Sequence, residues 1–219
     1  PPPAAPPPAA PPPAAPPPAA PTAAPRAGES IHLVLDRSGS MQQASEAAYT
    51  GARELIEQLP DDTQVTITLF SSTVELGRRT TRAEALRTLS LRDANGTTCL
   101  NDAICLAVDT ELESPAERVT VVVVTDGQDT SSRRSVHDAQ QAVARFQAIP
   151  NWRILFMGSH QDAVVAAGAF GIPVGRAITY GTDPTNLRTA MRVASENTRA
   201  FRSTGADAFL PAQRAASVR

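Results

Sequence analysis

Residues 119–127 read Val-Thr-Val-Val-Val-Val-Thr-Asp-Gly. The first six side chains are all β-branched, which is typical of a central strand in a parallel sheet that is buried on both faces. Residues 31–40 have a similar arrangement, because the apolar run Ile-His-Leu-Val-Leu leads into Asp-Arg-Ser-Gly-Ser. A short apolar run that ends at a polar turn with a glycine indicates a buried strand. The two stretches therefore predict two inner strands, each followed by a polar loop.

Strands alternate with helices on both sides of these stretches. Further strands are expected at residues 64–70, 73–79, 153–157 and 177–180, the second of these as an antiparallel edge strand. Helices are expected at residues 41–59, 100–112, 135–148 and 162–170, and from Pro184 onward, where Asp183 is a helix cap. The alternation predicts an α/β fold: a doubly wound, mostly parallel sheet with helices on both faces.

The ends of the chain differ from this pattern. Residues 1–20 are four copies of Pro-Pro-Pro-Ala-Ala, so residues 1–27 are expected to be a disordered, extended linker. A Pro-rich ligand is the alternative, because residues 3–6 fit the pattern PxxP. Residues 28–205 form the expected domain, and residues 206–219 a frayed C-terminal tail, from which Phe209 and Leu210 could still pack back onto the domain. The chain begins at Pro1, and we expect it to be a fragment or a processed form.

Composition excludes several classes of function. The formal charge of the 219 residues is −2, which gives no reason to expect nucleic acid as a partner. No apolar run approaches the roughly 20 residues of a membrane span. The two cysteines, Cys99 and Cys105, rule out a disulfide scaffold and mildly favour a cytoplasmic setting. Both are expected to be buried, on different faces of a helix.

Three oxygen-rich segments lie where the predicted strands end or a helix begins. They supply Asp36, Ser38 and Ser40 after the first strand, Thr98 before a helix, and Asp126 after the central strand. In a doubly wound sheet, ligands bind beyond the carboxyl ends of the strands. Carboxylates and hydroxyls are hard oxygen donors, which suit Mg²⁺, Mn²⁺ or Ca²⁺.

Each segment also has an ordinary structural interpretation. Ser40 with Gln43 fits a capping box, Thr98 fits a helix N-cap, and Asp126 with Gly127 fits a turn. Capping and metal binding are compatible, since a capping hydroxyl keeps a free lone pair.

Taken together, the three segments resemble the von Willebrand factor A domain and its metal-ion-dependent adhesion site. The resemblance covers about residues 29–205, and residues 156–173 are similar to a compact group of such domains frequent in bacteria. It implies a six-stranded sheet of order 3-2-1-4-5-6 with one antiparallel edge strand. It also implies that Ser38, Ser40 and Thr98 bind the ion through hydroxyl oxygens, and that Asp36 and Asp126 bind directly or through water.

The resemblance implies an interaction module and not an enzyme. An ion with an open coordination position would bind an Asp or Glu carboxylate of a partner protein. Candidate rim residues for specificity are Arg37, Gln42, Asp129, Ser131 and His160.

Two alternatives stay open. The first is a structural module of the same fold whose metal site is vestigial. The second is Mg²⁺-dependent phosphoryl transfer, as in haloacid-dehalogenase-like phosphatases. Those enzymes have the motif Asp-x-Asp after the first strand, and the second Asp acts as an acid and base. This chain has Ser38 in place of that second Asp, and it has no lysine to bind a phosphate. A serine hydrolase is disfavoured because no Gly-x-Ser-x-Gly occurs, and the three histidines are expected to be structural or solvated.

Overall fold

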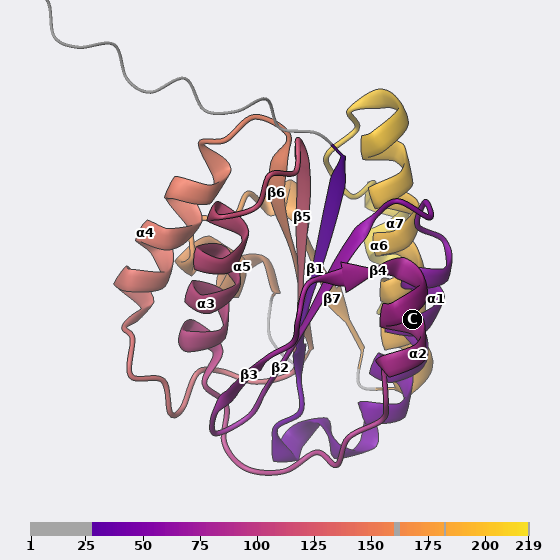
Figure 1. Cartoon of the computed structure of the whole chain (residues 1–219). Coiled ribbons are helices and arrows are strands. Elements are labelled where there is room, and N and C mark those ends of the chain that lie inside the picture. Colours follow the sequence, from indigo (N-terminus) through magenta and orange to yellow (C-terminus); the bar gives the residue numbers. More distant parts are fainter. Residues whose placement is uncertain (1–27, 160–162, 182, 219) are drawn as a thin grey trace, which may run out of the picture.

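A seven-stranded sheet runs through the middle of the protein (Figure 1). The computed structural model describes residues 28–159, 163–181 and 183–218, and the linker expected at residues 1–27 lies outside them. The strands are β1 (Glu29–Asp36), β2 (Gln64–Phe70), β3 (Val74–Leu76), β4 (Thr80–Thr81), β5 (Arg118–Thr125), β6 (Trp152–Ser159) and β7 (Ala177–Tyr180).

The order of the strands is β3-β2-β1-β5-β6-β7, with β4 paired to the other end of β2. All pairs among β2, β1, β5, β6 and β7 are parallel, whereas β3 and β4 are antiparallel to β2. The predicted fold class and strand order are therefore confirmed. The six expected strands are joined by a short seventh, because the edge strand β3 ends at Leu76 and Thr80–Thr81 then pairs separately with β2.

Gly77 explains this break in the edge strand. Its amide donates a hydrogen bond of 2.9 Å to the carbonyl of Ile67 in β2. A Cβ at residue 77 would stand 2.4 Å from that carbonyl oxygen, so only glycine allows the chain to fold this closely onto β2. The edge of β2 is consequently covered by two short segments in place of one long strand.

Helices cover both faces of the sheet, with α3, α4 and α5 on one face and α1, α2 and α6 on the other (Figure 1). The helices are the 3-10 turn η1 (Gly39–Gln43), α1 (Ser45–Glu57), α2 (Arg82–Thr88), α3 (Leu100–Leu112), α4 (Val136–Gln147), α5 (Ala163–Ala169), the 3-10 turn η2 (Val174–Arg176), α6 (Pro184–Thr204) and α7 (Pro211–Ala216). No helix in the described part of the chain combines the length and apolar surface that crossing a bilayer requires.

Two helices were not expected from the sequence. Helix α2 is short and half-exposed, and the side chain of Thr81 caps it by accepting from the amide of Glu84. The expectation of a frayed end after Gly205 is wrong for residues 206–218. That segment contains α7, and the amide of Gly181 donates to the carbonyl of Ser217 at 2.9 Å. Phe209 packs back into the core beside α6, as the sequence allowed, whereas Leu210 is exposed.

Candidate metal centre

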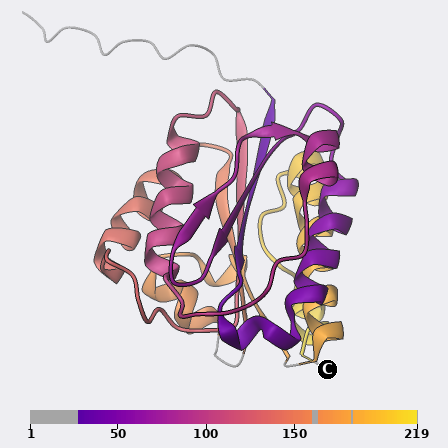
Figure 2. The same cartoon turned by 60° about the horizontal axis from the view of Figure 1, so that its bottom comes forward.

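The carboxyl ends of β1 and β5 lie next to each other in the middle of the sheet. Leu35 pairs with Val124, so the residues that follow these strands leave the sheet side by side. We call the three loops at this end, residues 36–40, 96–98 and 125–128, the crest. The crest lies at the same end of the sheet as η1, and Figure 2 shows the protein with this end turned forward.

The first crest loop is folded around the carboxylate of Asp36. The amide of Ser38 donates to Asp36 Oδ1 at 2.7 Å, and Thr125 Oγ1 donates to Asp36 Oδ2 at 2.6 Å. The hydroxyls of Ser38 and Ser40 lie 3.1 Å apart. Gly39 lets the chain pass the second loop, because its amide donates to the carbonyl of Gly96 at 3.0 Å.

The other two loops bring the remaining predicted residues to the same place. Ser40 Oγ donates to Asp126 Oδ1 at 2.6 Å. A Cβ added at Gly127 would stand 3.4 Å from Thr98 Oγ1 and 3.8 Å from Ser40 Oγ, so these two hydroxyls face one point beside the glycine. All five residues predicted from the sequence thus lie at the crest, four joined by hydrogen bonds and Thr98 through this shared space.

The helix-capping interpretations of two of these residues are wrong. Ser40 lies inside η1, and the residue before α1 is Ala44, which makes no side-chain cap. Helix α3 begins after Cys99, also without a side-chain cap, and Thr98 precedes it. Neither hydroxyl is therefore used to start a helix. The turn interpretation at residues 125–127 is correct, because the amide of Gly127 donates to Thr125 Oγ1 at 3.2 Å.

Burial gives Asp36 an unusual electrostatic environment. Loss of water raises the pKa of this carboxyl, hydrogen bonds from Thr125 and Ser38 lower it, and the neighbouring Asp126 carboxylate raises it further; the net effect is a raised pKa. Burial and the nearby Asp126 carboxylate thus both disfavour the ionised form of Asp36. A positive ion would stabilise this form.

Tyr180 at the end of β7 lies beneath the crest and was not found by sequence reasoning. Its hydroxyl donates to the carbonyl of Thr125 at 2.9 Å. Burial raises its pKa well above the usual value, and the carboxylates of Asp126 and Asp36 add to the rise. The phenol is therefore a neutral hydrogen-bond donor.

The predicted rim residues have different roles. The guanidinium of Arg37 pairs with Glu75, and Gln42 is exposed. Asp129 accepts from the amide of Asn101 at 3.2 Å and so holds the start of α3. Ser131 accepts from Thr97 Oγ1 at 2.8 Å. His160, the fifth predicted rim residue, lies outside the described residues.

In the described part of the chain, the softer metal ligands lie away from the crest or are buried. His32 is fully buried, with its Nδ1 3.1 Å from Glu111 Oε1 and its Nε2 2.7 Å from Thr68 Oγ1, while His137 is exposed on α4. Both agree with the expectation of structural or solvated histidines. Both cysteines are free and buried, as expected. They do not lie on different faces: Cys99 precedes α3, and both thiols join the same core.

The donors at the crest fit a hard divalent cation. They are all oxygens, from two carboxylates and three hydroxyls, and Gly127 leaves the space beside them free of a side chain. Within residues 28–159, 163–181 and 183–218, no group of three or more His, Cys, Asp or Glu side chains is placed to hold a metal ion. A cation at the crest must therefore use hydroxyl oxygens as well.

Comparison with known proteins agrees with this architecture. Residues 31–128 match the family model of the von Willebrand factor type A domain. No curated protein matches the chain. Among solved structures, a von Willebrand factor type A protein from Catenulispora acidiphila superposes with a TM-score of 0.59 at 20% identity, over 78% of this chain and 43% of that one.

Two further solved structures have the same fold. The PilB minor pilin from Streptococcus sanguinis gives a TM-score of 0.60 at 13% identity, over 82% of this chain and 63% of that one. Proximal thread matrix protein 1 from the mussel byssus, described as having a zinc-occupied MIDAS motif, gives 0.60 at 16% identity, over 78% and 46%. The chain thus spans less than two thirds of each of these proteins. Residues 31–128, from β1 to the turn after β5, thus match the von Willebrand factor type A domain, and the fold of the chain is the one found in these solved structures.

Proposed function

We propose that this domain is a metal-dependent protein-binding module. A divalent cation would be held at the crest by Asp36, Ser38, Ser40, Thr98 and Asp126. The observation that carries the proposal is the shared space beside Gly127, which the hydroxyls of Ser40 and Thr98 both face. Neither hydroxyl caps a helix, so both are available as ligands.

The proposed ligands also suit the binding of an acidic partner. Only two of the five are charged, so a divalent ion held by them stays electrophilic. Mg²⁺ usually keeps several waters in protein sites and prefers oxygen ligands. A carboxylate of a partner protein can replace such a water, and its negative charge complements the ion. The ion would supply this electrostatic attraction, while the crest side chains hold it in place and the loops around them select the partner.

The zinc-occupied motif of the mussel protein supports a divalent cation as the ligand in this fold. The ion in this chain is a separate question, because three hydroxyls and two carboxylates favour harder ions than zinc. We propose Mg²⁺, with Mn²⁺ or Ca²⁺ as alternatives.

Thermal unfolding tests whether the crest binds metal. The parent protein would be melted in EDTA and in excess Mg²⁺, Mn²⁺ or Ca²⁺. A ligand at about 100 times its Kd adds roughly 2.7 kcal/mol of stability, or roughly 5–10 °C in a domain of this size. Asp126→Ala should abolish the rise. Asp93→Ala removes an exposed acid from a nearby loop and should retain it. A parent protein that none of the three ions stabilises would favour the alternative of a vestigial site.

Capture of a partner tests the second half of the proposal. The domain would be immobilised, and binding of proteins from its native source compared in Mg²⁺ and in EDTA. We expect at least one partner that is retained only with Mg²⁺ and is lost with Asp126→Ala. A partner that binds equally well in EDTA would contradict a metal bridge.

A further inference from the structure

The side chain of Tyr180, at the end of β7, reaches past β6 to the end of β5 at the crest. Its strand, β7, pairs with β6 and not with β5. Its side chain nevertheless reaches the end of β5, where the hydroxyl donates to the carbonyl of Thr125 at 2.9 Å. The same hydroxyl lies 3.9 Å from the sulfur of Met41 in η1. The ring is buried, so these contacts are shielded from water.

Both contacts lead directly to proposed metal ligands. Thr125 donates to Asp36 through its side chain and is followed by Asp126. Met41 follows Ser40, and its amide donates to the carbonyl of Ser38 at 3.1 Å. Tyr180 thus contacts the two segments that carry four of the five proposed ligands, although its own hydroxyl is not one of the five.

The C-terminal segment, residues 206–218, holds β7 on both sides of Tyr180. Ser217 Oγ donates to the carbonyl of Thr179 at 2.6 Å, and the amide of Gly181 donates to the carbonyl of Ser217 at 2.9 Å. Ser217 is fully buried. Near the other end of the segment, the amide of Phe209 donates to the carbonyl of Gly175 at 2.7 Å. The segment therefore runs along the outer edge of β7.

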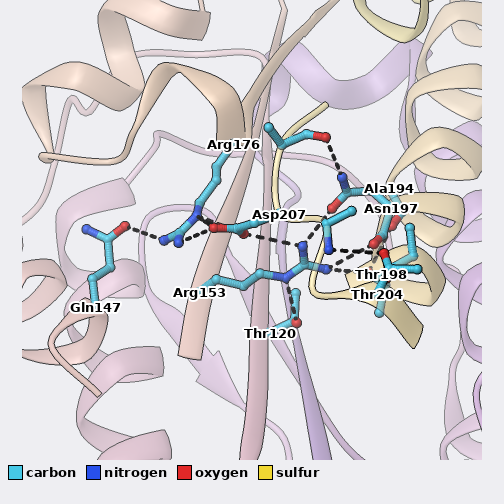
Figure 3. Close-up of polar contacts among 12 residues, drawn as sticks. Thr120, Gln147, Arg153, Arg176, Ala194, Asn197, Thr198, Thr204 and Asp207 are labelled. Carbon is cyan, nitrogen blue, oxygen red and sulfur yellow. Dashed lines mark hydrogen bonds and ion pairs between the residues drawn. The ribbon is translucent and has the colours of Figure 1, made fainter. Parts of the chain in front are cut away.

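An ionic cluster around the buried Arg153 anchors the start of this segment (Figure 3). Asp207 accepts from Arg176 Nε at 2.9 Å and lies 3.5 Å from Nη1 of the fully buried Arg153. Arg153 Nη1 also donates to Asn197 Oδ1 at 2.7 Å, and Asn197 Nδ2 donates to the carbonyl of Ala208 at 3.0 Å. The segment is thus tied to β6, to η2 and to α6 before it reaches Ser217.

We propose that Tyr180 is a positioning residue for the metal centre, and that the C-terminal segment keeps it in place through Ser217. The inference rests on the proposed function for its metal-binding part. It goes beyond that function because it assigns a role in the site to a strand and a segment that contain none of the proposed ligands. Without the Tyr180 hydroxyl, the carbonyl of Thr125 loses a buried donor, and the turn that starts at Thr125 and carries Asp126 is less constrained.

Tyr180→Phe tests the role of the hydroxyl while the ring is kept. Tyr49→Phe is a matched control, because Tyr49 is the other tyrosine of the chain and its hydroxyl contacts the carbonyl of Leu89 at 3.4 Å, away from the crest. Calorimetric titration with Mg²⁺ and with Mn²⁺ should show roughly tenfold weaker binding by Tyr180→Phe, within the range known for residues that orient metal ligands. Tyr49→Phe should bind as the parent does.

Hydrogen exchange gives a readout that needs no metal. In EDTA, Tyr180→Phe should exchange faster than the parent in peptides covering residues 36–41 and 125–128, and Tyr49→Phe should not. Ser217→Ala should show the same pattern with smaller changes, and also faster exchange at residues 177–181.

The two measurements separate failure of this inference from failure of the proposed function. A parent protein that binds neither ion contradicts the proposed function, and the exchange data alone then decide the role of Tyr180. Exchange of Tyr180→Phe equal to that of the parent in both peptides would overturn the inference. Unchanged metal affinity of Tyr180→Phe, with a parent that binds metal, would also overturn it.

Discussion

Ser40 Oγ and Asp126 Oδ1 lie 2.6 Å apart, although the two residues are separated by 86 positions in the sequence. The contact joins η1 to the end of β5 across the crest. Ser40→Ala should weaken Mg²⁺ binding at least tenfold, because it removes a ligand and a partner of Asp126. Stability in EDTA should fall by only about 1 kcal/mol, the value of one hydrogen bond. Titration calorimetry and urea unfolding measure the two effects. Ser45→Ala, which removes an exposed hydroxyl nearby, should change neither by as much.

Gly127→Ala tests the space beside the crest hydroxyls. The added methyl would be in ordinary contact with Thr98 Oγ1 and Ser40 Oγ at 3.4 and 3.8 Å, so the apo fold should tolerate it. The same methyl would occupy the space in which we place the ion. We expect an unfolding midpoint in EDTA within a few degrees of the parent and no stabilisation by Mg²⁺. Parent-like stabilisation by Mg²⁺ would show that the ion binds elsewhere.

Asp36→Asn should change how stability in EDTA depends on pH. The pKa of Asp36 is raised in the folded protein, chiefly by burial, so its ionised form opposes folding. Its favourable contribution is complete below the pKa of the unfolded chain and is lost as pH rises through the higher folded value. Asparagine does not ionise. The variant should therefore gain stability relative to the parent as the pH is raised from 4 to 8, measured by urea unfolding in EDTA. In Mg²⁺ the parent should be the more stable protein at pH 8, because the variant lacks the charge that binds the ion.

Glu111 is expected to stabilise the fold at neutral pH. Its side chain is fully buried. Glu111 Oε1 lies 3.1 Å from Nδ1 of His32, and Glu111 Oε2 lies 3.1 Å from Nη2 of Arg79. Burial alone would raise its pKa, but the hydrogen bond and charge of His32 and the charge of Arg79 lower it. Its contribution is thus present above the unfolded value of 4.5 and is lost as pH falls through the folded value.

Glu111→Gln leaves the two basic groups without a carboxylate. It should cost about 3 kcal/mol or more at pH 7, the cost of breaking a buried ion pair. The loss should shrink at pH 4. Urea unfolding at both pH values measures it, and Glu113→Gln on the exposed side of the helix end is the control. An equal loss at both pH values would contradict the assigned charge.

Two glycines in helices should respond to alanine in opposite directions. A Cβ at Gly51 in α1 would stand 2.7 Å from Cβ and Cγ of Met191 in α6, so Gly51→Ala should destabilise the fold by about 1–3 kcal/mol. At Gly168 in α5 nothing lies within 4 Å of the added carbon. Gly168→Ala should stabilise by roughly 0.4–1 kcal/mol by restricting the unfolded chain. Thermal unfolding measures both effects: the midpoint should fall for Gly51→Ala, where two helices pack closely, and rise for Gly168→Ala, where the added methyl meets nothing.

The sequence alone predicts the inner sheet well, because buried parallel strands and their helices have strong patterns. The expected ranges 100–112 and 177–180 agree with α3 and β7, and Asp183 caps α6 as expected. Helix α2 was missed because only seven residues form it and few of them are buried. The pattern Thr81-x-x-Glu84 was a usable signal for its start.

The metal centre could be predicted from the sequence only in part. The oxygen-rich segments are visible because each follows a strand or precedes a helix. Tyr180 is not visible, since its role depends on a side chain that reaches from β7 past β6 to β5. The packing of residues 206–218 depends in the same way on partners distant in the sequence, Arg153 and Arg176 among them.

The two ends of the described domain lie at different ends of the sheet. Gly28 precedes β1 at the end opposite to the crest, whereas Ser217 contacts the carboxyl end of β7, beside Tyr180. A bead, a sensor surface or a fused protein joined before residue 28 therefore leaves the crest facing outward. The same attachment after residue 218 would crowd the crest loops and could mask a genuine ligand. Orientation of the immobilised protein is thus a variable that binding assays on this domain should control.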